Sequence, residues 1–298
     1  MLARAHRQSV APSDQPASNG PGDNQGPHDP RNPDRRNKTW RPAEPSPEGH
    51  LQLWLANKRL AQFEHAAGEA IVTSHPAWIT FDIGSVGDEQ AAGVELADSI
   101  AATSPYLERL SLHAVGEPLL SKAFWTLIED ERTQAIPIVD AKSPGTLLSD
   151  ENVDRLLASN LKILRIALDG ATPETYKRIH GGNLSEVTEG IRRLTNRRTE
   201  RGGSSLKIYL QMTLMLENIH ELPMMIDLGH DLGTDALWAR HLDRGDGIQA
   251  HDGWIFDYEA QHLSNHPVLS GKMLEAAEAR ADKIGYSFHL YSELWMPG

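Results

Sequence analysis

Polar and charged residues stand at the ends of six short apolar stretches of this sequence. They are Asp82, His113 with Glu117, Asp140 with Lys142, Asp169, Glu217 with Asn218, and Arg240, His241, Asp243 and Arg244. Turn residues and a helical pattern follow the stretches, which predicts repeated strand–turn–helix units. Such repeats form parallel βα structure, in which chemistry gathers at the carboxyl ends of the strands. These side chains are therefore expected to face one rim and to form a ligand pocket there.

A metal site of the barrel-hydrolase kind is an alternative use of this rim. His113, Asp140, Asp169 and His241 are suitable ligand types, and a hydrolytic site needs about three protein ligands and an open position for water. The sequence has no His-x-His or His-Glu-x-x-His spacing, however. A single histidine at a strand end is more often a hydrogen-bonded structural residue, so no metal site is predicted.

Two stretches of the chain carry a resemblance to a known family. Residues 107–120 contain Gly116-Glu117-Pro118, and residues 163–176 contain Ala167-Leu168-Asp169-Gly170. Glu217-Asn218 and residues 221–235 continue the pattern. In order and spacing, these segments resemble the radical S-adenosylmethionine (radical SAM) enzymes, in particular the SPASM type, which usually carries a cysteine-rich C-terminal extension. The resemblance covers about residues 76–290.

The resemblance implies a cofactor site at the predicted rim. In the family, the segment that matches Gly116, Glu117 and Pro118 receives the amino group of S-adenosylmethionine. Glu117 could accept charge-assisted hydrogen bonds from this ammonium group. Asp169 and Asn218 are the other residues expected to bind the cofactor.

Three positions depart from the family's pattern. Ala167 stands where a serine commonly helps to hold the carboxylate of the cofactor, and alanine cannot donate a hydrogen bond. His180 replaces a common arginine and is only partly charged at neutral pH. Ser143-Pro144-Gly145 stands where a Thr-Asn-Gly turn is usual. Each change weakens the expectation of ordinary S-adenosylmethionine binding.

The cysteines of the family are missing. The family holds a [4Fe–4S] cluster with three cysteines in the loop after the first strand, residues 84–90 here, but this chain has no cysteine. Thiolates hold such clusters, and His75, Asp88 and Glu89 cannot replace three soft ligands. The cysteine-rich C-terminal extension is missing as well. The cluster and reductive cleavage of the cofactor are therefore not expected, and no catalytic residue is predicted.

Two functions of different classes follow from these observations. The first is a non-catalytic relative, a pseudoenzyme that binds a small ligand or a peptide-like or protein partner at the barrel mouth, with S-adenosylmethionine as one candidate ligand. The second is an enzyme, either of radical SAM type or a barrel repurposed for polar chemistry such as metal-assisted hydrolysis. The loss of every cysteine favours the first.

Composition narrows the range of partners. The net charge of −12 disfavours an electrostatic interaction with nucleic acid or anionic lipid. No apolar run is long enough to span a bilayer, and the N-terminus lacks the apolar region of a secretory signal. A cytoplasmic location is expected, with no disulfide and no thiolate zinc site.

The predicted architecture is an α/β fold, a partial (β/α)₆ TIM-like barrel of radical SAM type. Residues 1–47 hold nine of the 18 prolines and are expected to form a disordered tail. Residues 48–75 are expected to be a helical lead-in, and residues 76–298 the barrel with a C-terminal helix and strand. The strands are expected at 78–83, 107–113, 135–140, 161–168, 206–214, 236–241 and 286–291.

Overall fold

A computed structural model of the chain describes residues 47–68, 73–83, 90–113, 116–202, 204–246, 248 and 250–291. The predicted tail lies outside these residues, apart from Pro47, which begins helix α1 (Pro47–Ala67). α1 overlaps residues 48–75, for which a helical lead-in is expected. None of the helices in the described part of the chain combines the length and apolarity that crossing a membrane requires.

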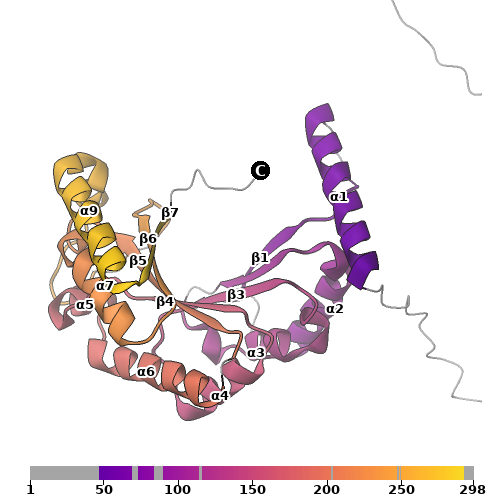
Figure 1. Cartoon of the computed structure of the whole chain (residues 1–298), viewed down its shortest axis with the longest axis horizontal. Coiled ribbons are helices and arrows are strands. Elements are labelled where there is room, and N and C mark those ends of the chain that lie inside the picture. The colour runs from indigo at the N-terminus through magenta and orange to yellow at the C-terminus, as the bar shows by residue number, and fades with distance from the viewer. Residues whose placement is uncertain are drawn as a thin grey trace, which may run out of the picture. The chain divides into compact units, whose positions relative to one another are not determined.

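A sheet of seven parallel strands forms the centre of the fold (Figure 1). The strands pair in sequence order from β1 to β7, and no pairing between β1 and β7 closes the described sheet. They are β1 (Trp78–Asp82), β2 (Arg109–His113), β3 (Ile138–Ser143), β4 (Ile163–Ala167), β5 (Lys207–Leu214), β6 (Ala236–His241) and β7 (Ser287–Tyr291). The predicted partial barrel is confirmed, and the C-terminal strand is its seventh.

The third strand was predicted three residues too early. It was expected at 135–140, but β3 runs from Ile138 to Ser143. Pro137 has no N–H for the ladder, so pairing begins after it, when the N–H of Ile138 donates to Glu108 O at 3.1 Å. Asp140 consequently lies in the middle of a strand instead of at its end.

Helices cover one side of the sheet. The helices that follow α1 are α2 (Gln90–Thr103), α3 (Lys122–Glu129), α4 (Asp150–Ala158), α5 (Pro173–His180), α6 (Leu184–Glu200), α7 (Leu222–Asp231), α8 (Tyr258–Gln261) and α9 (Pro267–Ile284). Side chains cap several of these helices, as when Thr172 Oγ1 accepts from Thr175 N at the start of α5. Figure 1 shows α2, α3, α4, α6, α7 and α9 along the outer side of the curved sheet, and no described helix along its inner side.

The two faces of the sheet differ in chemistry. Residues that face the helices are apolar and buried, as Leu110, Leu112 and Val139 are, and they form the main core. Alternate residues of the same strands face the inner side, and many of them are polar. Parallel sheets covered by helices on both faces have nearly continuous apolar strands. A polar inner face therefore marks a surface built for something other than packing.

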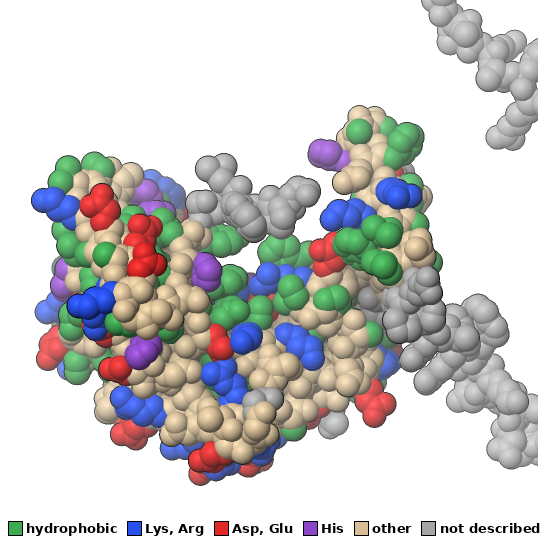
Figure 2. All heavy atoms as spheres, in the orientation of Figure 1, with side chains coloured by type: hydrophobic (Ala, Val, Ile, Leu, Met, Phe, Trp, Pro, Cys, Tyr) green, Lys and Arg blue, Asp and Glu red, His purple; other side chains and the backbone are tan. Residues whose placement is uncertain are grey.

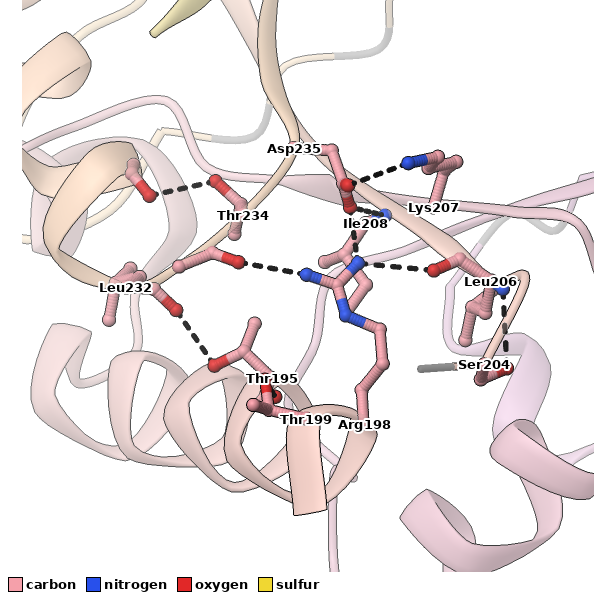
Figure 3. A network of polar contacts seen from close by, with 12 residues as sticks. Thr195, Arg198, Thr199, Ser204, Leu206, Lys207, Ile208, Leu232, Thr234 and Asp235 are labelled. Atoms are coloured by element: carbon pink, nitrogen blue, oxygen red, sulfur yellow. Dashed lines mark hydrogen bonds and ion pairs between the residues drawn. The ribbon is translucent and has the colours of Figure 1, made fainter. Parts of the chain in front are cut away.

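At the starts of β5 and β6, opposite the predicted rim, lies a polar network that we call the edge network (Figure 3). Asp235 accepts hydrogen bonds from Ile208 N at 2.8 Å and Lys207 Nζ at 3.1 Å, and pairs with Arg198. The same guanidinium donates to the carbonyl oxygens of Leu206 at 3.1 Å and Gly233 at 3.0 Å. The network joins α6 to the starts of β5 and β6.

Candidate functional site

A buried carboxylate lies on the inner face, on strand β3. Asp140 is fully buried, and its Oδ2 accepts hydrogen bonds from Arg109 Nε and Ser111 Oγ, both at 2.7 Å. Its Oδ1 pairs with Arg165 of β4. Burial acts to raise the pKa of Asp140, but the two guanidinium groups outweigh it and hold this pKa below its ordinary value. The carboxylate thus fixes two arginines, one from each of the strands that flank β3. We call these four residues, with His113, the inner cluster.

His113 completes this cluster as a neutral imidazole. Its Nε2 lies 2.7 Å from Nη2 of Arg165, and the guanidinium can only donate, so Nε2 must accept. Burial and the positive charge of Arg165 lower the pKa of His113, which agrees with a neutral imidazole. The imidazole therefore orients Arg165 and adds no charge.

Lys142 is an inner-face cation without a direct partner. It forms no hydrogen bond or ion pair with any residue that the structure describes, and burial lowers its pKa although Asp169 acts in the opposite direction. Arg240, on β6, instead forms an ion pair with Asp246. Figure 2 shows Lys and Arg atoms in the hollow between α9 and α1. Several cationic side chains thus lie on the inner face of a protein whose net charge is −12.

Three buried polar atoms have no hydrogen-bond partner among the described residues. They are Arg165 Nε, Gln211 Oε1 and Trp238 Nε1. All three belong to the inner face, because Gln211 pairs in register with Ala167 and Trp238, on the face that also carries Arg165. Buried polar atoms are nearly always satisfied by protein or water, so a group of three calls for an explanation. A bound ligand or ordered water would supply the missing partners.

Glu117 has three hydrogen-bond partners in its own neighbourhood. Its Oε1 accepts from Ser143 Oγ at 2.7 Å and from Leu119 N at 3.2 Å, and Oε2 accepts from Thr146 Oγ1 at 3.2 Å. It thereby caps the short 3₁₀ helix Pro118–Leu120 and ties it to the end of β3. Burial raises the pKa of Glu117. Gly116 precedes it with a φ of 110°, a backbone conformation that glycine adopts without strain.

Asp169 and Asn218 use their side chains to hold the strand ends. Asp169 accepts from Thr213 N at 2.5 Å and pairs with His180 Nε2 at 3.0 Å. Asn218 is fully buried, donates to Asp169 O and Thr213 O, and accepts from Met215 N. These bonds occupy both amide hydrogens of Asn218. Cofactor contact by Gly116, Glu117, Pro118, Asp169 and Asn218 stays a prediction.

The structure does not bring all the predicted rim residues together. Glu217 pairs with Arg178 at 2.6 Å, and Arg244 pairs with Glu259. Strand alternation places His241 on the opposite face from Arg240. Among the described residues, no three histidine or carboxylate side chains converge in a way that could hold a metal ion. Of the four residues named for the hydrolase alternative, His113 and Asp140 both contact Arg165, whereas Asp169 pairs with His180.

Sequence reasoning missed most of the inner face. The missed residues are Arg109, Ser111, Arg165, Tyr209, Gln211 and Trp238. A signal was present, because polar residues recur at every second position in the stretches 109–113 and 209–213. The candidate residues predicted from the sequence lie at strand ends, so this alternation along the strands was not used.

Glu221 is another buried carboxylate that the sequence analysis did not identify. Its Oε2 accepts from the backbone N–H groups of Ala171 and Thr172, and its Oε1 from the hydroxyls of Thr172 and Thr175. The carboxylate therefore holds the first turn of α5 against the start of α7. This is a structural role at the strand-end side of the fold.

The iron–sulfur cluster does not fit the donor set of this chain. The loop of residues 84–89, where the family's cysteines would lie, is outside the described residues. The sequence nevertheless contains no cysteine at any position. Three thiolates are required, and none exists.

Comparison with known proteins finds similarity over the central segment. The profile of the radical SAM superfamily matches residues 93–229. A probable GTP 3′,8-cyclase of Methanococcus maripaludis is 30% identical over 121 residues, which are 40% of this chain and 38% of that enzyme. A pre-heme d1 synthase of Dinoroseobacter shibae is 26% identical over 178 residues, which are 57% of this chain and 40% of that enzyme. The matches thus span about two fifths of the length of these relatives.

A solved structure has the same fold at low identity. SuiB of Streptococcus suis, in a crystal structure with bound S-adenosylmethionine, superposes with a TM-score of 0.58 at 13% identity. The superposition covers 83% of this chain and 57% of SuiB. A crystal structure of SuiB bound to its precursor peptide SuiA gives 0.57 at 12% identity, with 86% and 56% covered. The likeness supports the partial-barrel architecture.

Proposed function

We propose that this chain, whose residues 93–229 match the radical SAM superfamily, binds a small ligand at the inner face of its sheet without an iron–sulfur cluster of its own. The observation that carries the proposal is the group of unpartnered polar atoms on that face. A sheet kept only as a scaffold would gain stability from apolar residues at these positions, because each unsatisfied buried group costs about 1–3 kcal/mol. The absence of cysteine argues against the radical chemistry of the superfamily.

S-adenosylmethionine is the first candidate ligand. Glu117 Oε2 accepts from Thr146 Oγ1 at a long 3.2 Å, and a carboxylate oxygen can accept more than one hydrogen bond, so acceptor capacity remains for an ammonium group. Burial raises the pKa of Glu117, and a bound cation would offset the cost of keeping this carboxylate ionised. Gly116 and Pro118 set the backbone beside it. Asp169 and Asn218 would contribute by fixing the neighbouring strand ends.

Calorimetric titration with S-adenosylmethionine tests the proposal. Glu117→Gln should weaken binding by roughly 1–3 kcal/mol, because the charge-assisted hydrogen bond is lost. The matched control is Glu129→Gln, which changes an exposed glutamate of α3 that pairs with Arg155. The control should bind as the wild type does. Absence of binding to folded wild-type protein at millimolar concentration would contradict this assignment of the ligand, and would favour a peptide-like or protein partner at the same face.

Anaerobic reconstitution with iron and sulfide tests the absence of the cluster. We expect no stoichiometric iron and sulfide and no visible charge-transfer absorption after desalting. A protein that retained both would restore the alternative of a catalytically active radical SAM enzyme.

A further inference from the structure

Three inner-face donors lack a direct acceptor and come from strands close together in the sheet. Lys142 of β3 pairs in register with Arg165 of β4, so their side chains leave the sheet side by side. Trp238 lies on β6, two strands from Arg165. Lys142 has no hydrogen-bond partner among the described residues, and Arg165 Nε and Trp238 Nε1 are without partners as well. Neighbouring strands are about 4.8 Å apart, so one group of small size can reach donors from several of them.

The side chains that lie between these donors leave space for a ligand group and hold the donors in fixed directions. Ala167 of β4 has only a methyl group, and its register neighbour Gln211 has an unpartnered, buried carbonyl oxygen. Gln211 is 8% exposed. The Trp238 ring stacks on Tyr209 with centroids 5.1 Å apart, which fixes the direction of its N–H group. The surroundings therefore hold the donors in place before any ligand arrives.

The charges of this region determine the class of ligand. Arg109 and Arg165 share the single carboxylate of Asp140, which leaves an excess of positive charge in that cluster. Lys142 adds another cation, on which the carboxylates of Asp169 and Asp246 act without forming an ion pair with it. A cationic group would be repelled here, and an uncharged acceptor would satisfy hydrogen bonds but leave the positive charge unbalanced. An oxyanion has several acceptor oxygens, and its hydrogen bonds to cationic donors are the strong charge-assisted kind.

We propose that Lys142, Arg165 and Trp238 bind an oxyanion group, a carboxylate or a phosphate, of the ligand that the inner face accepts. The inference rests on the proposed function and deepens it by naming the chemical class of one ligand group. Gln211 Oε1 would accept from a donor next to that group, such as a hydroxyl or an amide N–H. His113 and Asp140 act as positioning residues, because they orient Arg165.

The test is a titration of the full chain with inorganic phosphate and, separately, with acetate. The thermal unfolding midpoint is followed at constant ionic strength, with chloride as the reference anion. A specific anion raises the midpoint in a saturable way, because it binds the folded state. A response to phosphate alone assigns a phosphate site, and a response to acetate alone or to both assigns a carboxylate-accepting site.

Matched variants show whether the anion is bound at this place. Lys142→Gln and Lys207→Gln remove the same charge and side chain, but Lys207 is an exposed member of the edge network. Lys142→Gln should weaken anion binding about tenfold, whereas Lys207→Gln should leave it unchanged. Trp238→Phe removes the N–H donor and keeps a ring against Tyr209, so it tests the site without a change of charge. Equal anion responses in wild type, Lys142→Gln and Trp238→Phe, or no response beyond chloride, would overturn the proposal.

The outcome is separable from that of the proposed function. Binding of S-adenosylmethionine that depends on Glu117, with no anion response, would leave the proposed function in place and reject the oxyanion site. A saturable anion response that Lys142→Gln removes, without binding of S-adenosylmethionine, would keep the site and assign a different ligand.

Discussion

The inner cluster and the edge network have similar charges, but they differ in whether their remaining donors find acceptors. In each, one aspartate is held by two cations: Asp140 by Arg109 and Arg165, and Asp235 by Arg198 and Lys207. The remaining donors of Arg198 reach the carbonyl oxygens of Leu206 and Gly233. Arg165 Nε has no such acceptor.

The difference separates a structural network from one prepared for a ligand. The edge network closes on backbone groups at the starts of strands, which stabilise the barrel whatever it binds. The inner cluster instead keeps a buried donor, Arg165 Nε, without an acceptor among the described residues. The same composition of charges therefore does not indicate function, whereas the presence or absence of acceptors does.

The largest effect is expected from Asp140→Asn. It leaves two partly buried guanidinium groups without their shared anion, so the free energy of unfolding should fall by roughly 3–5 kcal/mol. Asp235→Asn is the comparison, with an expected loss of about 1–3 kcal/mol, because Lys207 is exposed and Arg198 keeps its carbonyl partners. Denaturation with urea measures both. A larger loss for Asp235→Asn would break the contrast between the two regions.

Arg198→Gln should separate stability from binding. It removes two hydrogen bonds to carbonyl oxygens and an ion pair, so the free energy of unfolding should fall by roughly 2–3 kcal/mol. The anion response of the inner face should be unchanged, since none of its donors is altered. Loss of that response in a folded Arg198→Gln protein would show that the two regions are coupled.

The inner cluster should also make stability depend on pH. His113 has a lowered pKa in the folded protein, relative to an ordinary value of 6.5. As pH falls below about 6.5, the unfolded chain takes up a proton on this imidazole while the folded protein does not, so stability is lost. The slope is at most about 1.4 kcal/mol per pH unit. His113→Gln should flatten the urea stability profile between pH 7 and pH 5, whereas the exposed His220→Gln should not; equal profiles would remove the neutral imidazole from the cluster.

The smallest effect is a gain in stability. Gln211→Met replaces a buried carbonyl oxygen that has no partner with an apolar group of similar length, which should raise the free energy of unfolding by about 1 kcal/mol. The same change should weaken a ligand that donates to Oε1. A variant less stable than the wild type would indicate that ordered water already donates to Gln211 Oε1. The missing protein partner of this oxygen would then not point to a ligand.

The sequence by itself determined the order of the elements. Apolar runs followed by turns and capped helices were enough for the parallel sheet, because local patterning and short connections leave few other topologies. The sequence also determined that the chain cannot hold an iron–sulfur cluster with its own thiolates, because it contains no cysteine in any arrangement. Pro137 shows the limit of such reasoning, because the exact start of β3 depends on which neighbouring carbonyl is free to accept.

Only the tertiary structure decided which polar residues act together. Arg109, Asp140 and Arg165 are far apart in the sequence, and register alone places them on one face. The sequence favoured Asp169 and Asn218 as ligand contacts, yet their side chains are largely occupied by neighbouring backbone groups. Whether a donor already has a hydrogen-bond partner depends on the acceptors that the fold brings within about 3 Å. Residue type and spacing do not contain this information.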